Sequence, residues 1–141
     1  MFNAEDVAQY ILSSRDSEDP ISHLKLQKLL YYCQGFHLAI FDKPLFKEAI
    51  YHWDHGPVVP QVYNAYKSYG SSNLPVVSVD ENTLNEQAKE IINEVLSVYG
   101  QFSAWKLRDM THEESPWANT NDNEEISHSL LKNYFSTQIN L

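Results

Sequence analysis

The chain is expected to fold around residues 22–41, which read SHLKLQKLLYYCQGFHLAIF. Ser22 is suited to cap a helix that ends near Phe41. On a helical wheel one face of this segment carries Leu26, Leu29, Leu30, Cys33, Phe36 and Ile40. A second stripe, nearly opposite, carries Leu24, Tyr31 and Leu38. A helix that is apolar nearly all round is typical of the middle of a bundle, and the alternative use of the second stripe is a seam for a partner.

Shorter helices are predicted on both sides of this segment. The first covers residues 4–13, is capped by Asn3, and is followed by a polar loop from Arg15 to Pro20. After the long helix, Pro57 is suited to the first turn of a helix that ends at Gly70. One face of that helix would carry Val59, Val62, Tyr63, Tyr66 and Tyr69.

The second half of the chain is predicted to contain three more helices. Thr83 and Glu86 have the spacing of a capping box and open a helix that ends at Gly100. A short helix is expected over residues 103–110, with an irregular segment over 111–121. The capping spacing recurs in Asp122 and Glu125, at the start of a last helix that carries Leu130, Leu131, Tyr134 and Phe135.

The segment between the long helix and Pro57 has a different pattern. Pro44 interrupts it, and the short runs 45–46 and 50–53 favour a small β-hairpin near residues 45–53. With no internal repeat and no long linker, the whole chain, residues 1–141, is expected to form a single domain. The predicted fold class is therefore mainly α, a compact helical bundle around one central long helix.

Composition restricts the compartment. Hydrophobic residues make up 43% of the chain, which is enough to form a core. A lone cysteine, Cys33, excludes an intrachain disulfide and a zinc site built from several thiolates. The first residues lack the charge pattern of a signal peptide, and no apolar run approaches the roughly 20 residues of a spanning helix. A cytoplasmic protein with no membrane partner is expected.

Net charge is −9 and is concentrated in the second half. Residues 1–70 carry six Lys or Arg against eight Asp or Glu, whereas residues 71–141 carry four against eleven. Binding to a phosphate backbone requires clustered cations, so direct contact with nucleic acid is not expected. The acidic half suits a basic protein partner, and the alternative reading is that the charge only confers solubility.

No set of residues predicts catalysis or a cofactor. Cys33 lies on the inner face of the long helix, where a thiol behaves as a small hydrophobe. The four glycines never occur in a phosphate-loop pattern. His52 and His55 are the one pair that suggests a metal, but structural and catalytic zinc sites require further ligands arranged in a defined geometry. We expect a protein that is not an enzyme and holds neither metal nor cofactor, with a metal-dependent hydrolase as a less favoured alternative.

Lys28 is an unusual residue for its predicted position, because it lies among apolar neighbours on the long helix. A buried ammonium group requires an acceptor, an aromatic face or a route to water. The favoured hypothesis is an internal ion pair with Asp54 or Glu114. The other is a binding groove lined by tyrosines.

A surface for a partner protein is predicted where the 53–57 turn, the tyrosine-rich helix and the edge of the long helix meet. Tyrosine and tryptophan are frequent anchors of interfaces. The alternative is that the tyrosines only pack the core. We also expect Tyr66→Ala and Lys67→Ala to weaken binding without lowering the melting temperature. The predicted contact residues are Lys25, Lys28, Tyr32, Trp53, His55, Tyr63, Tyr66 and Lys67.

Three motifs together resemble one known family. They are LKLQKLLYY at residues 24–32, Trp53 followed by GPV at 56–58 with Val62-Tyr63 behind, and THE at 111–113 followed by Pro116-Trp117. In this order and spacing they resemble the Panacea domain of SocA-like and phage-associated, GepA-like proteins. The resemblance covers nearly the whole chain. The motif residues present here are Lys25, Gln27, Lys28, Tyr31, Trp53, Gly56, Pro57, His112 and Trp117, of which Gly56, Pro57 and Trp117 are expected to be architectural.

The resemblance implies a helical antitoxin of a bacterial or prophage type II toxin–antitoxin system. Such a protein neutralises its toxin by direct contact, and the toxin commonly inhibits translation. The expected partner is a cognate toxin, basic and encoded next to this chain, while the oligomeric state stays open. The alternative function is a proteolytic adaptor, or a phage accessory protein, that binds a client protein.

Overall fold

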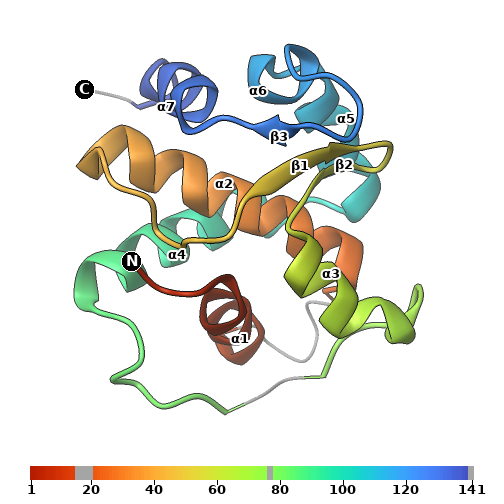
Figure 1. Ribbon diagram of the computed structural model, residues 1–141. Helices are drawn as coiled ribbons and strands as arrows, with labels where there is room; N and C mark the ends of the chain where they lie inside the picture. The colour runs from red at the N-terminus through yellow and green to blue at the C-terminus, as the bar shows by residue number, and fades with distance from the viewer. Residues whose placement is uncertain (15–20, 76–77, 140–141) are drawn as a thin grey trace.

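The computed structural model describes residues 1–14, 21–75 and 78–139 (Figure 1). Seven α-helices, one short 3-10 helix and three short strands are present in these residues. The predicted loop Arg15–Pro20 lies outside the described residues. The elements are α1 (Ala4–Ser14), α2 (His23–Phe41), β1 (Ile50–Trp53), β2 (Gly56–Val58), α3 (Pro60–Tyr66), η1 (Lys67–Tyr69), α4 (Glu86–Tyr99), α5 (Ala104–Glu113), α6 (Ser115–Ala118), β3 (Glu125–Ile126) and α7 (His128–Ser136).

The long helix α2 is the centre of the fold, as the sequence predicts. It crosses the middle of the molecule and packs against α1, α3, α4, α5, α7 and β2 (Figure 1). The Ser22 side chain caps it by accepting from the backbone N–H of Lys25, and Asp42 ends it in the left-handed conformation. Both apolar stripes are therefore mostly used within the fold, and a mainly α domain is confirmed.

Gly35 lets α7 approach α2 closely. A Cβ atom on Gly35 would overlap the ring of Phe135, which projects from α7 and is fully buried. The Phe135 ring packs edge-on against Tyr31 and Phe36, with centroids 5.4 and 4.8 Å away. Aromatic pairs of this geometry are favourable beyond the area that they bury.

The start of α1 is predicted correctly, and the start of α4 is not. Asn3 caps α1 by accepting from the backbone N–H of Asp6 at 2.8 Å. The capping box at Thr83 and Glu86 does not form, because Asn85 is the cap of α4 and accepts from Ala88 N–H. The apolar face of α4 still packs against α2, as its periodicity predicts.

The small sheet differs in its pairing from the hairpin expected near residues 45–53. β1 pairs with β2 on one side and with β3 on the other, both antiparallel. Phe46 makes an isolated parallel bridge to Phe2 near the N-terminus. The turn of the hairpin is therefore at residues 54–55, and the 45–46 run binds the N-terminal segment rather than β1.

Pro57 lies in β2 and does not start a helix. Helix α3 begins three residues later, with Pro60 in its first turn, and 3-10 helix η1 continues it to Tyr69. The two prolines are equally suited to a helix start by local preference. Antiparallel pairing of His52 with Pro57 decides between them, since it keeps residues 56–58 extended.

The C-terminal third contains one correct cap and two differences. Ser103 caps α5 as predicted, but α5 continues to Glu113 and α6 follows, where an irregular segment is expected. The last helix is capped by Ser127 and not by Asp122. Glu125, expected inside that helix, belongs to β3, because the β1 edge offers its backbone a partner.

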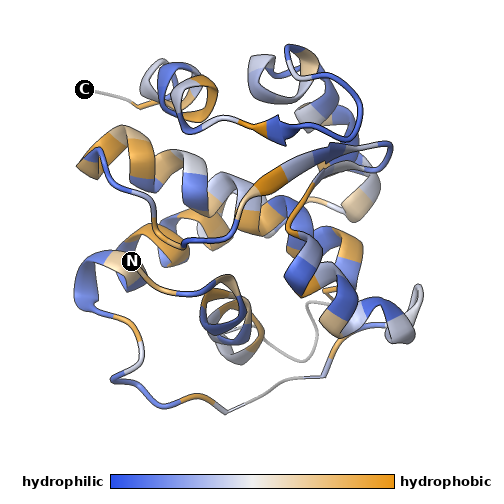
Figure 2. Ribbon diagram, in the orientation of Figure 1, coloured by the Kyte–Doolittle hydropathy of each residue, from blue (hydrophilic) through white to orange (hydrophobic). Residues whose placement is uncertain are grey.

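The apolar residues of α1, α2, α4 and α7 form one core, and Figure 2 shows hydrophobic and hydrophilic residues alternating along these helices. Fully buried residues on α1 include Val7, Ala8 and Ile11. Within the described ranges, no helix combines the length and apolar content that crossing a bilayer requires.

Candidate functional site

The site is built on the contact between the α2 helix and the β1–β2 turn. Gly56 has φ 114°, a conformation that L side chains rarely adopt. A Cβ atom there would lie 3.0 Å from Cε of Lys28 and 3.2 Å from Oγ1 of Thr111. The Gln27 side chain holds the next segment by accepting from Val59 N–H at 2.9 Å. Glycine at position 56 is thus required both by the turn and by the room that Lys28 occupies.

Lys28 is nearly fully buried, with 1% of its side chain exposed. The predicted ion pair with Asp54 or Glu114 is absent: among the described residues, no carboxylate forms an ion pair with Lys28. Burial, with a smaller contribution from the nearby charge of Arg108, lowers the pKa of Lys28 to about 7. The fold therefore holds an ammonium group in an environment that disfavours its charge.

Glu114 is bound to two tyrosines of α2 instead. The hydroxyl of Tyr31 donates to Oε1 at 2.9 Å, and that of Tyr32 donates to Oε2 at 2.8 Å. Burial raises the pKa of Glu114 to about 7, although these hydrogen bonds act in the opposite direction. Tyr32 is fully buried and stacks on Tyr99 at 3.9 Å, so its expected exposure at the helix edge is wrong.

A second buried cluster fixes α6 beside the hairpin. The ring of Trp117 lies between His52 and His112, with centroids 3.8 and 3.9 Å away. Its Nε1 donates to the carbonyl of Trp53, and its own carbonyl contacts Nδ1 of His52. These contacts fit the architectural role expected of Trp117.

His52 and His55 do not converge. His52 is buried and contacts Asp122 at 3.1 Å, whereas His55 is exposed in the turn. In the part of the chain that the structure describes, no three His, Cys, Asp or Glu side chains are grouped as a metal site would require. The geometry gives no support to the metal-dependent hydrolase.

A groove of about 180 Å³ opens where α2, the β1–β2 turn and α5 meet. We call it the Lys28 groove. Arg108 extends over the ring of Trp105, 5.2 Å from its centroid, and 72% of Trp105 is exposed. Exposed tryptophan beside arginine is a composition typical of binding hot spots. The groove is lined by Leu24, Lys28, His55, Ala104, Trp105 and Arg108.

The remaining predicted contact residues divide into two groups. Trp53 and Tyr63 are half-buried and pack edge-on, 5.0 Å apart, close to the hairpin turn. Lys25 is mostly buried and donates from Nζ to the carbonyl of Gly100, so it is not an exposed contact. Of these residues, Trp53 and Tyr63 remain candidates for partner contact near the hairpin turn, and Lys25 does not.

Tyr66 also differs from the prediction. It is 9% exposed, and its hydroxyl donates to Glu5 Oε1 at 2.8 Å, which ties α3 to α1. Replacement by alanine would therefore destabilise the fold, contrary to the expected unchanged melting temperature. Lys67 is exposed, as predicted.

Sequence reasoning missed Trp105 and Arg108. The signal for Trp105 was present: Leu107 and Thr111, four positions apart, are the buried residues of α5, so Trp105, two positions before Leu107, faces elsewhere. Nothing in the local sequence pairs Arg108 with Lys28, since the two are 80 residues apart and only the packing of α5 on α2 brings them together.

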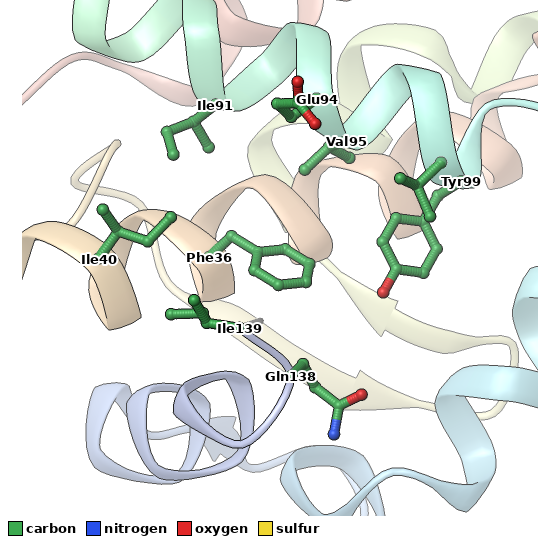
Figure 3. A pocket seen from close by; sticks show the side chains of 9 residues that line it. Phe36, Ile40, Ile91, Glu94, Val95, Tyr99, Gln138 and Ile139 are labelled. Carbon is green, nitrogen blue, oxygen red and sulfur yellow. The ribbon is translucent and has the colours of Figure 1, made fainter. Parts of the chain in front are cut away.

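A second groove, of about 310 Å³, lies at the other end of α2, between α2, α4 and the residues after α7. We call it the apolar groove. Figure 3 shows Phe36 and Ile40 facing Ile91 and Val95 across it, with Ile139 at its edge. It contains no cation, and its one charged lining residue is Glu94.

Comparison with known proteins identifies the class to which this helical domain belongs. Residues 26–118 match the family described as "Antitoxin SocA-like, Panacea domain", a range that covers nearly all of the motif-bearing part of the chain, and the chain belongs to this family. A relative in it is Antitoxin SocA of Caulobacter vibrioides (strain NA1000 / CB15N), which is 30% identical over 128 residues, 82% of this chain and 68% of the relative. No solved structure matches the chain.

Proposed function

We propose that this protein is an antitoxin of a type II toxin–antitoxin system, which neutralises a toxin by binding it directly. Family membership and the relative named an antitoxin support this role. The observation that carries it is the Lys28 groove: Leu24 and Lys28 of the 24–32 motif line it beside His55 of the hairpin turn, and its Trp105 is 72% exposed. Such a groove suits recognition of another protein.

The partner is proposed to be the toxin encoded next to this chain, a basic protein overall that acts on translation. The net charge of −9 supports steering of a basic partner. Exposed acids on α4 contribute to this charge. Both proteins would act in the cytoplasm.

We also propose that the chain is not an enzyme. The most nucleophilic side chain, Cys33, is fully buried, and burial raises the pKa of its thiol far above neutral. The buried carboxylate, Glu114, is occupied by two tyrosine hydroxyls. The buried thiol and the buried carboxylate are thus both taken up in packing.

Co-expression tests the function. The neighbouring gene alone should arrest growth, this chain should restore growth, and the two proteins should copurify as a stable complex. A neighbouring gene that is harmless alone contradicts the proposal. Toxin lifetime should be unchanged or longer in the complex; a shorter lifetime that depends on a cellular protease would identify an adaptor instead.

A further inference from the structure

The Lys28 groove has a charge opposite to that of the protein as a whole. The chain carries −9, yet the groove is lined by Lys28, His55 and Arg108 and by no carboxylate. Burial lowers the pKa of two histidines near Lys28, His23 on α2 and His112 on α5, and the charge of Lys28 contributes to both shifts. Three basic side chains thus line one opening, with two further histidines near Lys28.

Lys28 lacks a counter-ion within the described residues. Asp54 is exposed to solvent, and Glu114 is bound by Tyr31 and Tyr32. A buried cation without a partner is costly, and a fold retains one at the expense of stability. On α2 itself, two further buried polar atoms have no hydrogen-bond partner, Nδ1 of His23 and Nε2 of Gln27. Buried polar groups without partners require an explanation, and for Lys28, which lines the groove, a ligand supplies one.

The remaining lining is apolar. Leu24, Ala104 and Trp105 supply it, and the guanidinium of Arg108 lies over the Trp105 ring. A volume of about 180 Å³ suits one short side chain. A ligand that fits must therefore bring a single negative charge and an apolar group close to it.

We propose that the Lys28 groove receives an Asp or Glu side chain of the partner toxin, placed beside Lys28 and flanked by an apolar residue that packs on Trp105. This inference rests on the proposed function and specifies its contact. The chemistry favours a protein carboxylate over nucleic acid, because a chain of charge −9 repels a polyanion and the groove walls are apolar. The carboxylate is a local feature of a toxin that is basic overall.

A double-mutant cycle across the complex tests the contact. The toxin is the protein encoded next to this chain, and each of its Asp and Glu residues is changed singly to Asn or Gln. In the antitoxin, Lys28→Met and Trp105→Ala are compared with Lys43→Met, an exposed lysine beyond the other end of α2. Affinities are measured by titration calorimetry, and folding of every variant by thermal unfolding.

Lys28→Met should weaken binding about 30-fold or more, the loss typical of breaking a buried charge pair. Trp105→Ala should weaken it about tenfold or more. Lys43→Met should change it less than about threefold. Replacing one particular toxin carboxylate should cause a similar loss of affinity. Combining that replacement with Lys28→Met should weaken binding little further.

The outcomes separate the contact from the function. If the parent pair binds and growth is restored but Lys28→Met and Trp105→Ala bind like the parent, the groove assignment is wrong and the antitoxin function stands. If Lys28→Met weakens binding but no toxin carboxylate couples to it, the carboxylate assignment is wrong. If the parent chain neither binds nor restores growth, both proposals fall.

Discussion

Helix α2 supports two grooves, one at each end, and they are built from opposite chemistry. Near its N-terminal end, Lys28 lies beside the Gly56 turn among further basic groups. Near its C-terminal end, Phe36 and Ile40 face the apolar side of α4 (Figure 3). The second arrangement follows the ordinary rule that apolar surface packs together. The arrangement around Lys28 opposes this rule, since it buries a cation without a partner. Departures of this kind from folding preference occur at functional sites.

This difference predicts that the C-terminal end supplies stability and the N-terminal end supplies binding. Five substitutions test it, from the largest expected effect to the smallest.

Phe135→Ala should lower the free energy of unfolding by about 3–5 kcal/mol, because it removes a fully buried ring that fills the space above Gly35. Urea denaturation measures the loss. The matched control at the other end is Trp105→Ala, which removes an exposed ring and should change stability by less than about 0.5 kcal/mol. Equal losses of unfolding free energy for the two variants would contradict the division of roles between the two ends of α2.

Lys28→Met should stabilise the fold by about 1–4 kcal/mol while weakening toxin binding. The folded pKa of about 7 lies below the ordinary value of 10.5, so the cost of burying the charge is fully present below about pH 7. Above that pH the native lysine releases its proton and the cost declines. The gain in stability over the parent should therefore shrink as pH rises from about 7 toward 10.5. A variant that is less stable than the parent at neutral pH would show that Lys28 is structural.

Glu114→Gln should have the opposite pH dependence. Burial raises the pKa of Glu114 from 4.5 to about 7, so the favourable contribution of its proton is complete below about pH 4.5 and is lost as pH rises through 7. The amide variant should match the parent in acid and exceed its stability by roughly 1–3 kcal/mol above pH 7. Unfolding curves at several pH values measure this difference. A stability gain of Glu114→Gln that is larger in acid than in base would contradict the raised pKa of Glu114.

Tyr66→Phe should cost about 1 kcal/mol, because it removes the hydrogen bond to Glu5 and keeps the ring. Lys67→Ala, on the exposed neighbouring position, serves as its control and should leave stability unchanged. Thermal unfolding compares the two. A stable Tyr66→Phe variant with weaker toxin binding would return Tyr66 to the partner surface that the sequence predicts.

Val98→Ser should have the smallest effect. Val98 lines the apolar groove and is 47% exposed, so little packing is lost. Toxin affinity, measured by calorimetry, should change less than about twofold. A tenfold loss would show that the apolar groove, and not the Lys28 groove, carries the interface.

Helix caps show how far the sequence allows prediction. Asn3, Ser22 and Ser103 cap the predicted helices, because each acts on backbone groups two or three residues away. Thr83 and Asp122 carry the same signal and fail. Asn85 and Ser127 are the caps used, at the positions where α4 and α7 enter the packed structure. Where two local signals compete within a few residues, distant packing selects one.

For the site, the difference between the sequence prediction and the structure is larger. The sequence places Lys28 on the buried helix and marks Trp53, Gly56 and Trp117 through the family motifs, and these residues do lie around one end of α2. It pairs Glu114 wrongly with Lys28, because a lysine and a glutamate invite an ion pair whenever both are expected to be buried. In the structure the hydroxyls of Tyr31 and Tyr32 donate to this carboxylate instead.

Residue spacing alone was sufficient to define α2, its apolar faces and its cap, since helical periodicity and capping are local properties of the backbone. The Lys28 groove has no local origin. It exists because α5, more than 70 residues further along the chain, packs against α2 and brings Trp105 and Arg108 to Lys28. Electrostatic environment depends on distance in space, and spacing along a chain carries no information about it until the helices have packed.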